Sequence, residues 1–487
     1  MTEAVLAGAP ARRALLSEDQ LAVVVGLFVF ALALVGLGGF DALGWVASTS
    51  VWTDPAKALG AVSKAYAQLG GLPALAATFV ALLATLSLVT YANGGDVKKF
   101  ALAFTVVFVI AYASWFIGSN AHLAAVTPAD FSKFGISWSL RLTNEGGFLV
   151  ALIAGLVIAN FFPRFAEWLR EAIRPELYVK IAIVILGGFI AVTAAGKLTF
   201  ASSLLLRGVA AIIEAYLIYW AVVYFVARKY FGFSREWAAP LASGISICGV
   251  SAAIATGGAI RARPQVAVFV SSLVVLFAVV EVAVLPFVAQ TFLSHEPLVA
   301  AAWLGLAVKT DGAAVAAGAI TESLLTSQAA AEGVKYEAGW IIGVTTTVKV
   351  FIDIFIGVWA FVLAEIWTKH INAGAGDRAR LAEIWERFPK FIIGFILTFA
   401  IALALALGFG LTQKLTPVIA EANTFRVIFF VLTFFSIGVL SNFRKLWEEG
   451  IGQLAALYFV SLFGFVIWVG LVISWVFFAG VKPPLAS

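Results

Sequence analysis

Cysteine, histidine and charged residues are scarce in this chain of 487 residues. A single cysteine, Cys248, excludes a disulfide within the chain, and three histidines without metal-binding spacing predict no zinc site. Charged residues make up 12% of the sequence and hydrophobic residues 62%, a balance far from that of soluble domains. The chain is therefore predicted to be an all-α polytopic membrane protein.

The usual signatures of enzymes and of nucleic-acid-binding proteins are also missing. The sequence has no phosphate loop, nucleophile elbow or His/Asp metal set, so we expect neither an enzyme nor a cofactor. The net charge of +5 comes largely from Lys and Arg in short loops between apolar stretches, where membrane topology explains them. We therefore expect no nucleic-acid partner.

Apolar stretches of about 20 residues, the length that crosses a hydrocarbon core, occur about thirteen times along the chain. Lys and Arg concentrate in alternate loops, which predicts a multi-pass protein of the cell inner membrane with a cytoplasmic N-terminus. Arg261 and Arg263 oppose this trend, because their loop is predicted on the outer side. The stretches lie near residues 20–39, 72–92, 100–118, 146–162, 177–195, 204–227, 235–260, 264–291, 298–321, 339–366, 391–411, 423–442 and 452–480.

Two short internal matches predict a repeat. Glu145 and Asp311 have similar neighbours near or inside apolar stretches, and Ser246–Gly249 is similar to Ser436–Val439. Five stretches then form one unit and five more a second, and because five is odd the second unit is inverted, as in many secondary transporters. The predicted division is 1–130 for three extra helices, 131–292 and 293–487 for the two units, and 367–390 for a cytoplasmic loop.

The segment from Gly244 to Gly258 is rich in small residues and predicts unusual backbone structure. In lipid every backbone polar group needs a partner, so a helix loosened here must face protein or a wet cavity. One interpretation is a helix interrupted at Gly249 that crosses a second one interrupted at Gly438; the other is close packing of continuous helices. The free N–H groups at an interruption would bind a small anion. Candidate substrate-binding residues are Ser246, Cys248, Gly249, Ser251, Lys309, Lys349, Ser436 and Gly438.

Charged residues within apolar stretches each require a partner or a function, since a charge at the bilayer centre costs about 2.5–3.5 kcal/mol. Lys349 and Asp353 are four positions apart on one predicted helix and can pair, either for structure or in a cavity wall. The segment 309–311 predicts a second non-helical or tightly packed crossing, or a local pair at a helix end. Glu214 and Glu281 are further candidates for carrying a proton. Candidate ion-coupling residues are Glu145, Thr310, Asp311 and Asp353.

The segment Ile247–Ala253 is similar to the ICG-x-SA signature of the YeiH-type family of sulfate exporters, and the resemblance extends roughly over residues 138–480. It implies an inverted-repeat transporter with two discontinuous helices that cross. We therefore expect a secondary transporter of a small anion, such as sulfate or an organosulfonate, coupled to H⁺ or Na⁺. Its surroundings are the lipid bilayer, and it could form a homodimer. A cation–proton antiporter on the same scaffold, with Asp311 and Glu145 as carriers, is the alternative.

Overall fold

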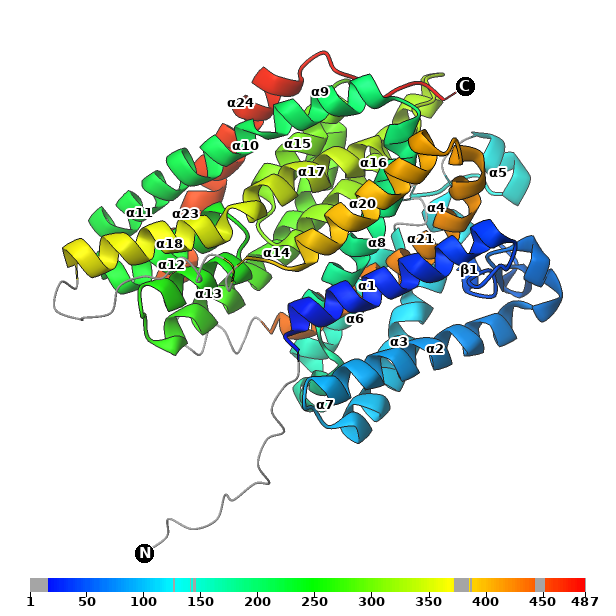
Figure 1. Ribbon diagram of the computed structural model, residues 1–487, viewed down its shortest axis with the longest axis horizontal. Coiled ribbons are helices and arrows are strands. Elements are labelled where there is room, and N and C mark those ends of the chain that lie inside the picture. Colours follow the sequence, from blue (N-terminus) through cyan, green and yellow to red (C-terminus); the bar gives the residue numbers. More distant parts are fainter. Residues whose placement is uncertain are drawn as a thin grey trace, which may run out of the picture.

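The computed structural model describes residues 16–125, 128–140, 142, 146–371, 385, 388–442 and 452–486, most of them in helices (Figure 1). Within these residues nine helices are long and apolar enough to cross a membrane, and α6 with α7, bent by 118°, would add a tenth. The all-α polytopic prediction is confirmed, and the count of thirteen stays a prediction. The longer helices are α1 (Glu18–Val35), α2 (Gly71–Ala92), α3 (Val97–Gly118), α6 (Gly146–Phe161), α8 (Pro175–Ala195), α14 (Pro264–Phe292), α16 (Asp311–Ala331), α17 (Trp340–Ile354), α20 (Phe391–Gly408) and α21 (Thr412–Leu440). The shorter elements are η1 (Gly36–Gly38), β1 (Ala47–Thr49), η2 (Pro55–Lys57), β2 (Leu59–Ala61), η3 (Lys64–Leu69), α4 (Ala121–Ala124), α5 (Pro128–Phe134), α7 (Pro163–Leu169), η4 (Arg170–Ala172), α9 (Leu198–Gly208), α10 (Ala210–Ile213), η5 (Glu214–Tyr219), α11 (Trp220–Lys229), α12 (Arg235–Ser246), α13 (Val250–Ala259), α15 (Pro297–Ala307), α18 (Ile356–Ile366), η6 (Trp367–Ile371), α23 (Gly452–Ser461), η7 (Leu462–Val466) and α24 (Ile467–Phe478).

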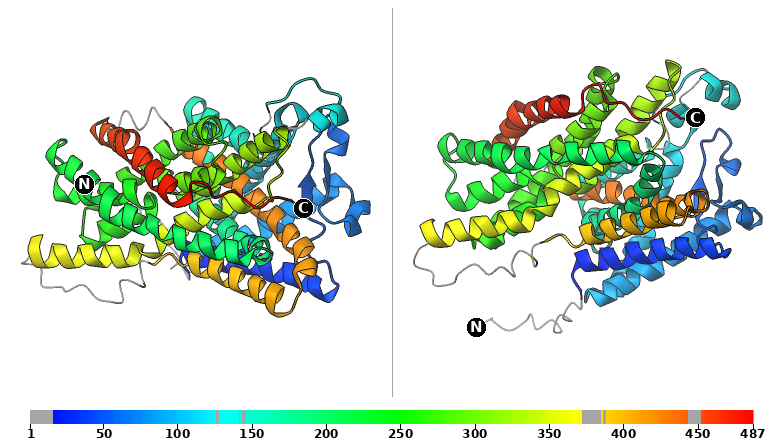
Figure 2. Two further views of the ribbon diagram at one scale, coloured as in Figure 1. Left: turned by 90° about the horizontal axis from the view of Figure 1, so that it is seen from above. Right: turned by 45° about the horizontal axis from the view of Figure 1, so that its top comes forward.

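The N-terminal helices pack along one side of the molecule (Figures 1 and 2). A capping box begins α1: the Ser17 side chain accepts from the backbone N–H of Gln20, whose own side chain accepts from the N–H of Ser17. Helix α1 packs against α8, α20 and α21, and α3 packs against α6 and α21. Strands β1 and β2 form a small antiparallel pair between α1 and α2. The N-terminal helices are thus continuous with the rest of the core.

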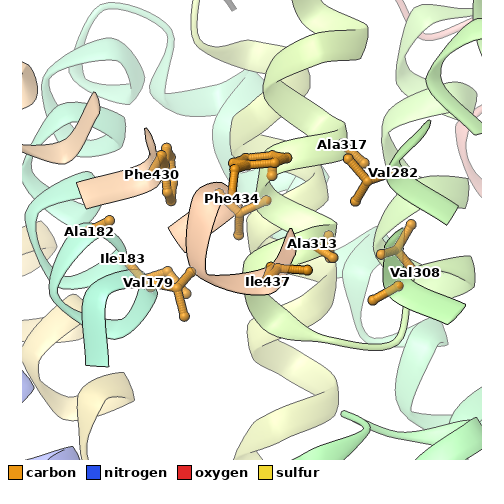
Figure 3. Close-up of a cluster of buried hydrophobic side chains, with 14 of the residues drawn as sticks. Val179, Ala182, Ile183, Val282, Val308, Ala313, Ala317, Phe430, Phe434 and Ile437 are labelled. Atoms are coloured by element: carbon orange, nitrogen blue, oxygen red, sulfur yellow. The ribbon is translucent and has the colours of Figure 1, made fainter. Parts of the chain in front are cut away.

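The centre of the fold is an apolar contact between α8, α14, α16 and α21 (Figure 3). Val179 of α8, Ala313 of α16 and Phe434 of α21 are almost fully buried there, and Figure 3 places Val308 at its edge. This packing positions the polar segment that precedes α16 (residues 308–310) beside the buried helices α8, α14 and α21.

The predicted interruption at Gly438 is wrong, because α21 is continuous from Thr412 to Leu440. Gly438 instead packs against Gly155 of α6. A Cβ atom on Gly438 would lie 2.4 Å from the Leu152 carbonyl oxygen and 2.9 Å from the Gly155 Cα. The alternative interpretation, close helix packing through small residues, therefore describes this position.

The segment that contains Gly249 is interrupted as predicted, but it folds back instead of crossing. Helices α12 and α13 pack against each other, and the Thr256 hydroxyl donates to the Ser243 hydroxyl at 2.7 Å. At their outer ends, the backbone N–H and the guanidinium group of Arg263 donate to the Glu236 carboxylate. Residues at nearly the same separation from 249 on either side are thus in contact, which defines a re-entrant helical hairpin, here called hairpin 1 (residues 235–259).

A second hairpin follows α14. Gly305 of α15 and Gly318 of α16 both pack against Thr345 of α17, so the two helices run side by side from a turn at 308–310. Their outer ends both lie beside the C-terminal segment: Glu296 accepts from the backbone N–H of Gly480, and residues 335–337 bond to residues 484–486. This element, hairpin 2 (residues 297–331), is non-helical at residues 308–310, close to the predicted segment 309–311, but it turns back instead of crossing.

The hairpins enter from opposite faces. They are joined by α14, a continuous helix of 29 residues that is about 43 Å long at 1.5 Å per residue. Its first end adjoins the base of hairpin 1, and its last end adjoins the base of hairpin 2. Because hairpin 1 turns back, Arg261 and Arg263 lie on the same face as Arg235, and their disagreement with the charge pattern disappears.

The predicted inverted relation between 131–292 and 293–487 depended on five crossings in each unit. Each unit contains one hairpin, so each loses a crossing, and both units then begin at the same face. In the structure α9, α10, η5 and α11 precede hairpin 1, and α14 joins hairpin 1 to hairpin 2, so the inverted repeat stays a prediction. The division of the chain at these boundaries stays a prediction.

Candidate functional site

The tips of the two hairpins meet inside the protein. Gly249 has φ +59° and ψ −106°, a conformation that only glycine adopts readily. A Cβ atom at this position would lie 3.1 Å from the Lys309 carbonyl oxygen and 3.3 Å from the Thr310 methyl group. The missing side chain therefore allows tip 1 (residues 247–249) to approach tip 2 (residues 308–310).

Lys349 of α17 joins the two tips. Its ammonium group donates to the carbonyl oxygen of Ile247 at 2.7 Å and to that of Lys309 at 3.4 Å. The side chain is only 2% exposed. These carbonyls lie at the C-terminal ends of α12 and α15, where the helix dipole favours a positive charge.

Two carboxylates face the same ammonium group. The Lys349 nitrogen lies 3.6 Å from an Asp311 oxygen and 4.0 Å from an Asp353 oxygen. The predicted pair between Lys349 and Asp353 is thus present, with Asp311 as a further partner. Ligand atoms of Cys248, Asp311 and Asp353 lie within 4.8 Å of one another. A cation could use these three atoms, but the lysine already places a positive charge against both carboxylates.

Lys309 has a comparable position on tip 2. Its ammonium group donates to the carbonyl oxygen of Leu306, in the last turn of α15, and lies 4.6 Å from the centre of the Tyr219 ring. Both Lys309 and Lys349 therefore neutralise carbonyl ends of the interrupted helices. The sequence predicted these lysines as counter-charges for an anion, and that role stays a prediction; in the structure their ammonium groups donate to backbone carbonyl oxygens.

The N-terminal ends of α13 and α16 are the other helix ends at the two tips. Gly249, at the start of α13, caps it with no side-chain bond, and at the start of α16 the Thr310 hydroxyl accepts from the backbone N–H of Ala313. Two adjoining hollows reach these ends. The larger, about 770 Å³, extends from charged residues of both signs, Glu18, Glu167, Arg170 and Arg174, to Val250. The smaller is lined by Pro175, Glu176, Val179, Val275, Ala278, Thr310, Gly312, Thr433 and Ile437.

Residues outside the predicted set also line these hollows. Ser271 of α14 lines the larger hollow, and its hydroxyl has no hydrogen-bond partner among the described residues. Glu176 and Val275 line both hollows. An aliphatic run such as that of α14 gives no sign of a binding wall, so the sequence could indicate Ser271 only as a polar residue in an apolar stretch.

The other predicted residues are distributed around this centre. Ser246, in the last turn of α12, is fully buried, and its hydroxyl has no partner among the described residues; the same is true of Ser436 in α21. Ser251 is half-buried in the first turn of α13. Gly438 lies in the contact with α6, and Glu145 lies outside the described residues. The structure thus brings together Cys248, Gly249, Lys309, Thr310, Asp311, Lys349 and Asp353.

Comparison with known proteins places the chain among membrane proteins. Residues 102–457 match the family model described as Conserved hypothetical protein 698. A UPF0324 membrane protein of Nitrosomonas europaea is 40% identical over 478 residues, covering 96% of this chain and 97% of that protein. A UPF0324 membrane protein of Rhodopirellula baltica is 28% identical over 414 residues, 83% of this chain and 66% of that protein. An uncharacterized protein of Archaeoglobus fulgidus is 48% identical over 161 residues, 29% of this chain and 86% of its own length.

Fold and site together define a polytopic membrane protein in which two re-entrant hairpins meet at a buried charged centre. The chain belongs to the UPF0324 membrane proteins, the family described as Conserved hypothetical protein 698. The resemblance to the YeiH-type family is consistent with this membership.

Proposed function

We propose that this protein is a secondary transporter of a small anion, with sulfate and organosulfonates as the first solutes to test. The observation that carries the proposal is the arrangement of helix ends at the tips. The N-terminal ends of α13 and α16 adjoin two hollows, while lysines neutralise the C-terminal ends of α12 and α15. Backbone N–H groups and the positive ends of half-helix dipoles bind anions in other transporters.

A proton is the coupling ion that fits this centre best. Asp311, Asp353 and Lys349 together carry a charge of −1 when all three are ionised. An anion at the nearby N-terminal ends is repelled until one carboxylate binds a proton, so the proton and the anion each favour binding of the other. We therefore assign H⁺ as the coupling ion, with Na⁺ as the alternative.

The test uses the full chain in proteoliposomes with labelled sulfate and a series of sulfonates inside and outside. We expect saturable exchange of at least one of these anions. Ser271→Ala should weaken the apparent affinity by about fivefold, since a neutral hydrogen bond contributes roughly 1 kcal/mol. The matched control is Ser202→Ala on α9, whose hydroxyl bonds within its own helix. No exchange of any of these anions by the wild-type protein would refute the proposal.

A cation–proton antiporter is the second candidate, and one observation favours it. Both oxygens of Asp353 and one of Asp311 have no hydrogen-bond partner among the described residues, although these residues are almost fully buried. A bound cation would satisfy such oxygens. Proton release from loaded proteoliposomes on addition of Na⁺ or K⁺, abolished by Asp311→Asn and without anion exchange, would replace the first proposal by this one.

A further inference from the structure

A second group of buried titratable residues surrounds Lys309, apart from the centre at Lys349. Its members are Glu214 and Tyr219 on η5, Glu281 on α14, Lys309 on tip 2 and Tyr458 on α23. Each of these five side chains is at most 1% exposed. The group includes both glutamates that the sequence marked as mid-span acids.

Hydrogen bonds tie this group to tip 2. The backbone N–H of Lys309 donates to Glu281 Oε2 at 3.0 Å, while the Lys309 carbonyl oxygen accepts from Lys349. The Lys309 ammonium group lies over the Tyr219 ring and interacts electrostatically with both glutamates and with Lys349. Lys309 therefore connects the two charged centres through its own backbone.

Several polar atoms of the group have no hydrogen-bond partner among the described residues: both carboxylate oxygens of Glu214, Glu281 Oε1 and the Tyr458 hydroxyl. The Glu214 carboxylate lies near the Tyr219 hydroxyl, since a Cβ atom on Gly470 of α24 would be 3.5 Å from Glu214 Oε1 and 2.7 Å from the hydroxyl oxygen. Buried groups of this kind are costly unless they bind something. When all three are ionised, Glu214, Glu281 and Lys309 together carry a net charge of −1. One bound proton therefore makes the net charge of the three groups zero.

The backbone around the group is also irregular. Glu214 begins the π-helical segment η5 and Tyr219 ends it, and the Tyr219 hydroxyl donates at 2.9 Å to the carbonyl oxygen of Val466, at the end of the π-helical segment η7. Two π segments thus meet at the same hydroxyl group. Such segments occur often at functional sites, because the wider turn frees backbone groups and re-aims side chains.

We propose that Glu214 and Glu281 form a second proton-binding site, linked to the hairpin tips through Lys309, whose proton travels with the transported solute. This inference rests on the proposed transporter function. The link is mechanical as well as electrostatic: an ionised Glu281 holds the Lys309 N–H by a charge-assisted bond, and a protonated one holds it more weakly. Uptake of a proton therefore loosens tip 2 beside the solute.

The experiment compares two modes of transport in proteoliposomes loaded with a pH-sensitive dye. Exchange of labelled for unlabelled solute at equal pH requires no net proton movement, whereas uphill uptake driven by a pH gradient does. We expect Glu214→Gln and Glu281→Gln to keep most of the exchange but to lower gradient-driven accumulation by at least tenfold, and the dye should report fewer protons moved per solute than in the wild type. The matched control is Glu322→Gln, since Glu322 accepts from the backbone N–H groups of Gly339 and Ile342 at the start of α17.

The outcomes separate the two proposals. If the wild-type protein exchanges no solute, the transporter function fails and this inference fails with it. If exchange occurs and both variants still accumulate solute and move protons like the wild type, the transporter stands and the second proton site is refuted. Accumulation driven by Na⁺ instead of a pH gradient would also refute it. Infrared spectra of the purified full chain provide a second measurement: a protonated-carboxyl band should be lost in Glu214→Gln or Glu281→Gln, and an unchanged spectrum in both contradicts the proposal.

Discussion

Gly249 is the position where a single methyl group should have the largest consequence. In Gly249→Ala the backbone must keep φ +59° and ψ −106°, and a non-glycine residue in such a sparsely populated conformation costs roughly 1–3 kcal/mol. The new Cβ would also lie 2.4 Å from Val274 Cγ1, and overpacking of this kind typically costs a further 1–3 kcal/mol. We therefore expect a large loss of stability and a change in the distance between the tips.

Gly258→Ala is the control within the same half-helix. Gly258 lies in α13, has helical backbone angles and has no atom within 4 Å of a Cβ position. Alanine there should be neutral or stabilising by up to about 1 kcal/mol, because it is the better helix former. Thermal unfolding in detergent measures stability, and anion exchange per folded molecule measures function. The reasoning is refuted if Gly249→Ala unfolds at the wild-type temperature or above and exchanges solute at the wild-type rate.

Three further predictions concern other parts of the fold. Lys349→Met should destabilise the protein by about 3–5 kcal/mol, because it leaves two buried carboxylates without their cation. Adding Asp311→Asn should recover part of this loss, and simple additivity of the two unfolding free energies in a double-mutant cycle would contradict the prediction. Gly438→Ala should lower the unfolding temperature, because its Cβ atom would clash with backbone atoms of α6. Gly343→Ala should not lower it, because no atom lies within 4 Å of that Cβ position. Equal unfolding temperatures for the two variants would exclude close packing at Gly438. In a Cys248→Ser background, Arg261→Cys and Arg228→Cys should react with an impermeant thiol reagent from one side of sealed vesicles and Lys335→Cys from the other. Labelling of Arg261→Cys and Arg228→Cys from different sides would rule out hairpin 1.

The interruption at Gly249 was predictable because glycine, small residues and an apolar setting together favour non-helical backbone. The direction of the chain after this interruption was not predictable. Residues 235–260 have the length of a crossing helix, and only the contacts Ser243–Thr256 and Glu236–Arg263 show the fold-back. One sign was present in the sequence: Arg261 and Arg263 disagreed with the charge pattern, as they must if one predicted crossing is a hairpin.

The two predicted interruptions, at Gly249 and Gly438, used the same signal and had different outcomes. Glycine allows unusual backbone angles and also allows helices to approach closely, and a sequence does not separate these uses. The true second tip had a more specific sign. Thr310 followed by Asp311 is a typical start of a helix, with a side-chain cap and an acid in the first turn. The pair of Lys349 and Asp353 was predictable from its spacing alone, whereas its contacts with both tips depend on tertiary packing.

The position of the smaller hollow connects the site to movement. Its walls come from two groups of helices: α14 and hairpin 2 on one side, and α8 and α21 on the other. Helices α8 and α21 pack along each other and are braced by α1, α6 and α20, while α15, α16 and α17 form their own packed group. The proposed solute position at the N-terminal end of α16 therefore lies at the border between two groups, each held together by its own contacts. In the proposed transporter, displacement of one group along the other would change access to this border without breaking either core, and because the hairpins enter from opposite faces, each of them would close the site toward one side.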